Sequence, residues 1–168
     1  MAILEILTYP DERLKQLAEP VTVFDQALHS FLRDLEETMR AGPGGVGIAA
    51  PQVGRFQRIA LVDCSVTRKP VPNHGLLVLI NPEISEWEGM TVGREGCMSV
   101  PDYTGNVIRA ERIRLQAFDA DGVQHEYQCE GFEARALQHE CDHLDGMLFL
   151  DRLVSRRNDL FRRKVYQK

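Results

Sequence analysis

The most constraining feature of this sequence is the pentad His139-Glu140-Cys141-Asp142-His143, which has the form HExxH. In an α-helix, residues four positions apart lie on one face, about one turn from each other. Two imidazole rings in this relation can bind one metal ion, and the glutamate beside the first ring can take a proton from a water molecule at that ion. The pentad therefore predicts a helix at this point and favours a metal-dependent hydrolase.

The residues around the pentad predict a helix over residues 131–144 that ends near Gly146. Leu137, Cys141 and Leu144 form an apolar stripe, which already provides a packing face. The two histidines lie on a second face. They could be structural residues held by hydrogen bonds, but burying two ionisable rings without partners would cost several kcal/mol. We therefore expect the histidine face to be functional.

A catalytic zinc-type site needs a third protein ligand, and the sequence after the pentad does not supply one. In the extended motif HExxHxxGxxH the last position is histidine, but here it is Phe149, and no glutamate follows Glu140. The third ligand must come from upstream. Cys97 is the best candidate, because a thiolate binds borderline and soft divalent metals strongly. The alternative is that Cys97 is a small buried hydrophobic residue.

The remaining cysteines and histidines lack such signals. Three cysteines show no CxxC pair and are expected to be free buried thiols: Cys64, Cys129 and Cys141. Three histidines have no partners at ligand spacing and are expected to be ordinary surface or core residues: His29, His74 and His125.

Hydrophobic periodicity predicts a helix in the N-terminal part and a group of strands after it. Residues 24–39 have apolar side chains at three- and four-residue spacing, with Asp25 as a plausible N-cap. The stretch 42–54 contains five glycines and two prolines, which break any helix. Strands are expected at residues 58–63, 76–81, 83–95, 113–118 and 123–128, the last two joined as a hairpin by the DADG turn at 119–122.

The order of these elements indicates an α+β fold. Residues 151–168 are predicted to form a further helix, although their apolar positions are only loosely periodic. We expect one catalytic domain over residues 1–168, with antiparallel β-sheets around a central HExxH helix, an N-terminal helix and a C-terminal helix.

The composition is that of a soluble globular protein, with 43% hydrophobic and 27% charged residues. No apolar run approaches the roughly 18 residues that span a bilayer. Residues 1–10 lack the features of a signal peptide. We therefore expect a cytoplasmic protein without membrane contact.

The net charge of −5 is unevenly distributed. Residues 152–168 contain seven Lys or Arg and one Asp, a charge of +6, so residues 1–151 carry −11. A basic end on an acidic body could indicate an acidic partner, whereas the simpler interpretation is a solvated helix face.

Three segments match motifs that occur in this order in one family. Residues 45–52 read GVGIAAPQ and match GxGxAAxQ, residues 95–99 read EGCMS and match EGCLS, and residues 138–146 read QHECDHLDG and match QHExDHxxG. From about Tyr9 to its end, the chain resembles the peptide deformylase family. The resemblance implies a hydrolase that removes the formyl group from the N-terminal formyl-methionine of newly made polypeptides and releases formate.

The resemblance also implies a metal centre. Cys97, His139 and His143 are expected to bind one divalent ion, usually Fe²⁺ in the family, with Zn²⁺, Ni²⁺ or Co²⁺ able to substitute. Glu140 is expected to be the general base. The Gln52 side-chain amide and the main-chain N–H of Met98 are expected to form an oxyanion hole.

The same resemblance implies a substrate site and a partner. We expect the substrate peptide to contact three residues of the first motif and the two residues that precede Cys97: Gly45, Gly47, Ile48, Glu95 and Gly96. Some family members use a C-terminal helix to reach the ribosome, and the basic segment 152–168 is consistent with such contact.

Two departures from the family pattern bear on the substrate. Met98 replaces the usual leucine, which should be nearly silent because the two side chains are close in volume. Residues 132–136 are largely aliphatic in many members and line the methionine pocket, but here they include Glu133 and Arg135. Either both point to solvent and pair with other charges, or the pocket is altered. We expect the first.

Two other functions fit parts of the sequence. A binding module that is stabilised by a metal ion and binds ribosomal RNA without turnover would explain the basic segment 152–168. It would not explain Glu140, because a structural metal site needs no general base. A conventional zinc peptidase would need the downstream ligand that is missing here.

Overall fold

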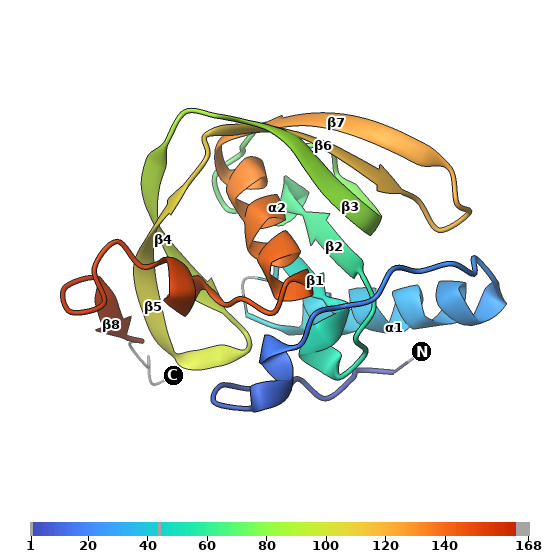
Figure 1. Ribbon diagram of the computed structural model, residues 1–168, viewed down its shortest axis with the longest axis horizontal. Helices are drawn as coiled ribbons and strands as arrows, with labels where there is room; N and C mark the ends of the chain where they lie inside the picture. Colours follow the sequence, from blue (N-terminus) through green and yellow to red (C-terminus); the bar gives the residue numbers. More distant parts are fainter. Residues whose placement is uncertain (1, 44, 164–168) are drawn as a thin grey trace.

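The central element of the fold is helix α2 (Gly131–Leu144), which lies between two antiparallel β-sheets in the computed structural model (Figure 1). The structure describes residues 2–43 and 45–163. Mixed helices and antiparallel sheets confirm the predicted α+β class and the central position of the HExxH helix.

The larger sheet has five strands in the order β1-β2-β3-β6-β7. Its strands are β1 (Gly47–Ala49), β2 (Ile59–Asp63), β3 (Leu76–Glu88), β6 (Arg112–Phe118) and β7 (Gln124–Glu130). The smaller sheet has the order β4-β5-β8, with β4 (Thr91–Cys97), β5 (Val100–Arg109) and β8 (Leu160–Arg162). Strands β1 and β4 each lie at the edge of their sheet.

Two expectations about the strands need correction. The strand expected at 76–81 continues to Glu88, because bulges between Ile80 and Glu83 and between Ile84 and Glu86 let β3 bend while it stays paired with β6. The bent strand expected at 83–95 is therefore divided between β3 and β4. Strand β5 was not predicted from the sequence, whereas the β6–β7 hairpin is confirmed.

Helix α1 (Gln26–Ala41) confirms the predicted N-terminal helix. The Asp25 side chain accepts a hydrogen bond from the Leu28 main-chain N–H, as the predicted N-cap should. Leu28, Leu32 and Leu35 pack with β1 and β2 in one core cluster. This cluster packs α1 against the short strand β1.

Helix α2 is buried along its whole length from Glu133 to Leu144. Its apolar side chains, Leu137, Cys141 and Leu144 among them, pack against β2, β3, β6 and β7 in a second core cluster. A third cluster joins Phe149 and Leu148, after the helix, to Val100 and Val107 of β5. Both sheets are therefore packed around the helix that carries the pentad.

The predicted C-terminal helix is wrong for the part of residues 151–168 that the structure describes. A short 3-10 helix, Phe149–Arg152, is followed by turns and then by β8, which pairs with β5 through Phe161 and its neighbours. Residues 164–168 lie outside the described residues. The apolar positions were too loosely periodic to form a helix face, and the open edge of β5 offered backbone hydrogen bonds instead. Within residues 2–43 and 45–163, no helix is long and apolar enough to cross a membrane.

Candidate active site

The three predicted metal ligands meet at one point. The sulfur of Cys97 lies 3.4 Å from Nε2 of His143, and this Nε2 lies 3.3 Å from Nε2 of His139. The ligand atoms of all three residues lie within 4.8 Å of one another, and all three side chains are buried. A thiolate and two imidazoles at this spacing are a donor set that fits a divalent cation.

Two elements from different parts of the chain bring these ligands together. The histidines lie one turn apart on α2, as the pentad predicted. Cys97 is the last residue of β4 and pairs with Val100, so that Met98 and Ser99 form a two-residue turn into β5. The Ser99 main-chain N–H lies 3.4 Å from the Cys97 sulfur. The turn therefore directs the sulfur back toward the helix.

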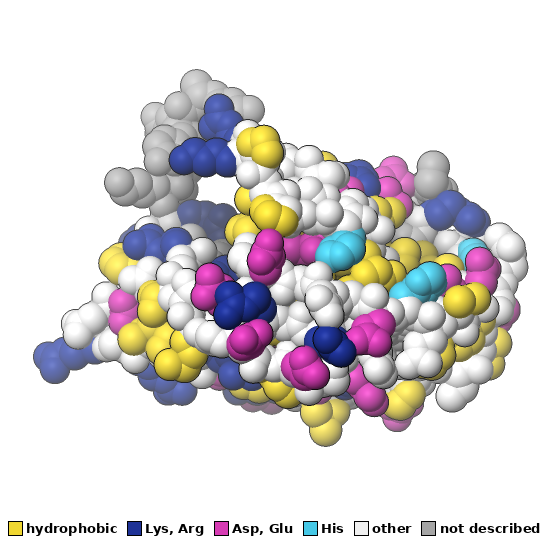
Figure 2. Space-filling view, turned by 90° about the horizontal axis from the view of Figure 1, so that it is seen from above, with side chains coloured by type: hydrophobic (Ala, Val, Ile, Leu, Met, Phe, Trp, Pro, Cys, Tyr) yellow, Lys and Arg dark blue, Asp and Glu magenta, His cyan; other side chains and the backbone are white. Residues whose placement is uncertain are grey.

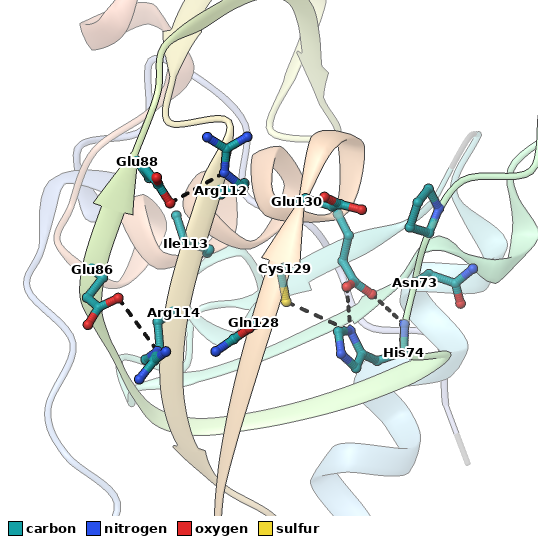
Figure 3. Close-up of a pocket in the computed structure, with 12 residues that line it drawn as sticks. Asn73, His74, Glu86, Glu88, Arg112, Ile113, Arg114, Gln128, Cys129 and Glu130 are labelled. Carbon is teal, nitrogen blue, oxygen red and sulfur yellow. Dashed lines mark hydrogen bonds and ion pairs between the residues drawn. The ribbon is translucent and has the colours of Figure 1, made fainter.

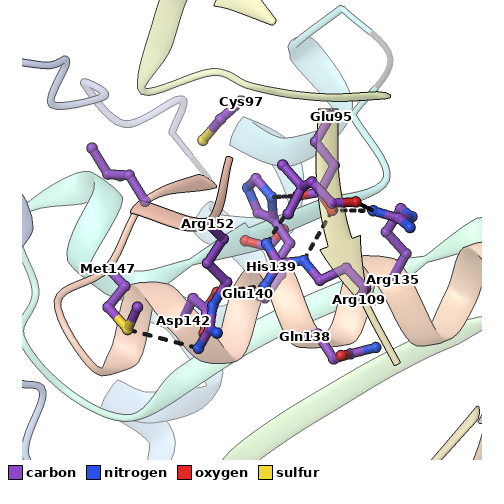
Figure 4. A network of polar contacts seen from close by, with 12 residues as sticks. Glu95, Cys97, Arg109, Arg135, Gln138, His139, Glu140, Asp142, Met147 and Arg152 are labelled. Atoms are coloured by element: carbon purple, nitrogen blue, oxygen red, sulfur yellow. Dashed lines mark hydrogen bonds and ion pairs between the residues drawn. The ribbon is translucent and has the colours of Figure 1, made fainter. Parts of the chain in front are cut away.

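Glu95 orients His139. Its Oε1 lies 2.9 Å from Nδ1 of His139 (Figure 4). This contact leaves Nε2 of the ring to face Cys97 and His143. Arg109 donates two hydrogen bonds of 2.9 Å to the same carboxylate and a third of 2.5 Å to Asp142. Burial alone would raise the pKa of Glu95, but the bonds from Arg109 and His139 outweigh it and lower that pKa.

Apart from Glu95, the residues of this ion network were not predicted from the sequence. Asp142 lies inside the pentad, yet neither its type nor its spacing indicated a partner. It accepts from Arg109 and from Arg152, the latter at 2.6 and 3.0 Å. No local pattern marks Arg109, because its partners Glu95 and Asp142 lie 14 and 33 residues away in the sequence.

The expectation that Glu133 and Arg135 point to solvent is wrong. Both residues are buried, at 1% and 8% exposure. Arg135 donates to Oε2 of Glu95 at 2.7 Å and to the carbonyl oxygens of Val107 and Thr91. Because its guanidinium is held by β4 and β5, Arg135 joins the network that supports His139.

Glu140 lies beside the three ligands and is buried, at 5% exposure. Burial raises the pKa of its carboxyl group to about 7. Its Oε1 has no hydrogen-bond partner among the described residues and lies 4.0 Å from Nε2 of His143. An unpartnered carboxylate oxygen at a metal-type donor set suits a proton acceptor.

The negatively charged groups around the two histidine rings favour a positive charge at this position. Burial lowers the pKa of His143, so that this ring stays neutral and can donate its lone pair. Burial also opposes protonation of His139, but Glu140, Cys97 and Glu95 outweigh it and raise the pKa of that ring. A divalent cation at the donor set would meet the same demand.

The Gln52 side chain is held near the Cys97 sulfur by one main-chain and two side-chain contacts. It lies in the 3-10 helix Ala50–Val53, directly after β1. Its Oε1 accepts from the Ala49 N–H at 2.9 Å, so its Nε2 is turned to Ser99 Oγ at 3.0 Å and to the Cys97 sulfur at 3.4 Å. The amide group can therefore donate hydrogen bonds at the candidate centre.

A cavity of about 610 Å³ opens beside the donor set. Its lining includes most of the residues predicted to be functional: Gly45, Gly47, Gln52, Glu95, Gly96, Cys97, Met98, His139 and Glu140. His143 lies deeper, at 1% exposure. Ile48 is fully buried in the α1 core cluster and is not among the described residues that line the cavity. The Ile48 side chain therefore lies outside the cavity lining, and contact between Ile48 and substrate stays a prediction.

Gly47 has a specific steric role at this cavity. A Cβ atom at position 47 would lie 2.5 Å from Oε2 of Glu140, and 3.0 Å from its carboxyl carbon. Any side chain here would displace the carboxylate. The glycine of β1 is therefore required by the position of Glu140, which sequence spacing alone did not indicate.

Comparison with known proteins places the chain in a family. The sequence profile described as polypeptide deformylase matches residues 3–159. A peptide deformylase from Thermodesulfovibrio yellowstonii is 44% identical over 168 residues, which are 100% of this chain and 99% of that protein. Another from Alkalilimnicola ehrlichii is 46% identical over 165 residues, which are 98% of this chain and 90% of that protein.

Solved structures agree with these relatives. The crystal structure of a peptide deformylase from Legionella pneumophila has a TM-score of 0.84 and 40% identity, and the match covers 93% of this chain and 90% of that one. A Met-Ala-Ser-bound class I type b peptide deformylase from Acinetobacter baumannii has a TM-score of 0.84 and 36% identity, and covers 90% and 99% of the two chains. The profile, the relatives and the fold agree: this chain belongs to the polypeptide deformylase family, whose members are metal-dependent hydrolases that remove the formyl group from the N-terminus of polypeptides.

Proposed function

We propose that this chain removes the formyl group from the N-terminal formyl-methionine of newly made polypeptides and releases formate, as one catalytic domain over residues 1–168. The convergence of Cys97, His139 and His143 beside the buried carboxylate of Glu140 carries this proposal. It combines a donor set for a cation with a proton acceptor, which hydrolysis of an amide requires.

In this proposal, the Cys97 sulfur and the Nε2 atoms of His139 and His143 hold one divalent cation. We assign Fe²⁺ to this position in the cell, with Zn²⁺, Ni²⁺ or Co²⁺ able to substitute, because a mixed thiolate and imidazole set suits these metals. When bound, the cation supplies Lewis acidity toward water and toward a carbonyl oxygen.

Glu140 moves the proton in the proposed reaction. Its carboxylate accepts a proton from the attacking water and then delivers that proton to the leaving amine. A pKa of about 7 suits both steps near neutral pH, because the group can accept and release a proton without a large energetic cost.

Gln52 and Met98 stabilise the negative charge that develops on the formyl oxygen. The Gln52 amide is held by the Ala49 N–H with its Nε2 toward the centre, so little reorganisation is needed when charge appears. The main-chain N–H of Met98, the first residue of the β4–β5 turn, is the second proposed donor. One such donor is typically worth about 3–4 kcal/mol of barrier.

The lining of the cavity supports the proposal that the substrate is a peptide that begins with methionine. Its apolar lining includes Val46, Phe132 and Ala136, which suit an unbranched thioether side chain. The free edges of β1 and β4 flank the cavity, at Gly47 and at Gly96, and can pair with an extended peptide backbone. The related Acinetobacter baumannii deformylase binds Met-Ala-Ser, and we assign a peptide of that kind to this cavity.

The basic segment 152–168 is proposed to contact the ribosome in the cytoplasm. The side chain of Arg152 is already paired with Asp142, so this contact depends on other residues. Arg156, Arg157 and Arg162 are exposed and are the described candidates. Phosphate backbones attract such arginines in a salt-dependent manner.

The Glu140→Gln variant tests the proposed reaction. We expect formate release from a formyl-methionyl peptide to fall by about 10²–10⁴-fold, because the proton acceptor is lost, while the metal content is kept. Protein should be purified without oxygen, since a thiolate centre oxidises readily. The exposed Glu12→Gln is the control. Full activity in Glu140→Gln refutes the general-base role, and no formate from metal-loaded wild type refutes the reaction.

The Gly47→Ala variant tests whether the position of Glu140 matters. The added Cβ must shift the carboxylate, so we expect turnover to fall by about 10–100-fold with unchanged metal content. If the effect acts through Glu140, the double variant Gly47→Ala/Glu140→Gln loses little more activity than Glu140→Gln alone. Additive losses in the double variant would contradict this explanation.

The Cys97→Ser variant tests the metal ligands. Changing a residue that only supports a ligand typically costs about 10–100-fold in metal affinity, and loss of the thiolate should cost at least as much. Metal titration of the stripped protein measures this affinity. Cys141→Ala, a buried cysteine in the core cluster on the other side of α2, should bind metal as the wild type does. Equal affinity in Cys97→Ser removes Cys97 from the site.

Co-sedimentation with ribosomes tests the proposed partner. Replacing Arg156, Arg157 and Arg162 together by Gln should weaken association at low salt, because counterion release is lost. The control replaces Arg112 and Arg114, which pair with glutamates on the other sheet. Association that is insensitive to both salt and the triple substitution contradicts the proposal.

A further inference from the structure

A second group of metal-type donors lies at the start of α2. The sequence suggested that His74 and Cys129 lack partners, but the structure brings both to Glu133. Figure 3 shows the His74 ring next to the Cys129 sulfur. One nitrogen, one sulfur and one oxygen from these residues lie within 4.8 Å of one another. They come from the segment before β3, from β7 and from α2, so no spacing in the sequence could have indicated the group.

Nδ1 of His74 lies close to donor atoms of both other residues. This nitrogen lies 2.6 Å from Oε1 of Glu133 and 3.8 Å from the Cys129 sulfur. The other carboxylate oxygen of Glu133 accepts from the His74 main-chain N–H at 2.8 Å. The carboxylate is therefore anchored by the backbone, while its first oxygen and the ring nitrogen both face the sulfur.

The three side chains differ in burial in a way that suits a binding site. The side chain of Glu133 is 1% exposed and Cys129 is 4% exposed, whereas the side chain of His74 is 39% exposed. Two donors are thus fixed inside the protein, and the third lies at the surface, on the segment before β3. A histidine that closes over two buried donors gives a cation an entry path.

The group borders a cavity of about 530 Å³ that favours positive charge. Four glutamates line it against two arginines: Glu86, Glu88, Glu130 and Glu133 against Arg112 and Arg114. Seen from above, acidic and basic side chains alternate on this face of the molecule (Figure 2). Arg112 and Arg114 are already paired with Glu88 and Glu86.

We propose that His74, Cys129 and Glu133 form a second cation site, which binds one Zn²⁺-class divalent ion through Nδ1, Sγ and a carboxylate oxygen, with its fourth position open to the cavity. Tetrahedral zinc with bonds of 2.0–2.3 Å places nitrogen, oxygen and sulfur ligands roughly 3.3–3.6 Å apart. The nitrogen–sulfur distance of 3.8 Å is close to this range. The nitrogen–oxygen distance of 2.6 Å must widen, which the exposed ring of His74 allows.

The chemistry of the donors fits this ion. A mixed set of nitrogen, sulfur and oxygen suits zinc and its neighbours better than magnesium or calcium, which prefer oxygen ligands alone. Burial and the adjacent Glu133 raise the pKa of the Cys129 thiol. The ion must therefore displace the thiol proton to solvent, and the bond to the thiolate replaces the S–H bond.

The second site is separate from the candidate active site. Glu133 and His139 lie on the same helix, but none of the three second-site residues is among the described residues that line the cavity around Cys97. The inference does not depend on the proposed deformylase activity. Its failure would leave that activity untouched, and the reverse also holds.

Metal counting on the holoenzyme tests the proposal. Protein that already carries one ion at the Cys97 site is equilibrated with Zn²⁺, and the bound equivalents are measured. We expect a second equivalent in the wild type, and a loss of at least tenfold in its affinity in His74→Ala and in Cys129→Ala. With Co²⁺ as the probe, a thiolate-to-metal absorption band should accompany the second equivalent and disappear in Cys129→Ala.

The His125→Ala variant is the matched control. His125 is also partly exposed, stacks on the same Tyr127 ring that His74 contacts edge-on, and pairs with Asp119. It should retain the second equivalent. Formate release serves as a folding check and should be unchanged in His74→Ala; should Cys129→Ala not fold, His74→Ala decides. A holoenzyme that binds only one ion, or a second ion that persists in His74→Ala, overturns the proposal.

Discussion

The rest of the site depends on the buried ion network of Glu95, Arg109 and Asp142. The Arg109 side chain is 2% exposed and that of Glu95 is 5% exposed, so each charge needs its partners. Removing one partner of such a group typically costs about 3–5 kcal/mol, because the others remain buried and unpaired. The network joins β4 and β5 to α2. It therefore sets where Cys97 on β4 lies relative to His139 on α2.

Burial of α2 from Glu133 to Leu144 explains why its polar side chains are so well partnered. Arg135 and Asp142 join the network below His139, and Gln138 bonds to both main-chain groups of Ala110. On another side, Glu133 is held by His74. Among the described residues, the exceptions on this helix are Oε1 of Glu140 and Nδ1 of His143. Oε1 of Glu140 lies beside the donor set, and an unpartnered buried oxygen there is what a site that awaits a ligand should have.

Some elements were predictable because their signals are local. The stripe of α1, its cap at Asp25 and the β6–β7 hairpin each follow from residues a few positions apart. The C-terminal helix was predicted wrongly, because β8 forms by pairing with β5, a segment distant in the chain. Strand β5 was missed, although it follows β4 through a two-residue turn. Glu133 and Arg135 look like surface residues in the sequence, and only the packing of both sheets around α2 buries them.

The sequence by itself determined the reaction class: the HExxH pentad places two imidazoles and a carboxylate on one helix, since helical spacing is a local property. Three ordered motifs also determined the family, which the comparisons bear out. Only the tertiary structure decided that the sulfur of residue 97 meets those rings, that Arg109 supports them, and that His74 and Cys129 find Glu133. The reason is physical: each of these contacts joins separate strands and helices, and their positions follow from the packing of the whole core.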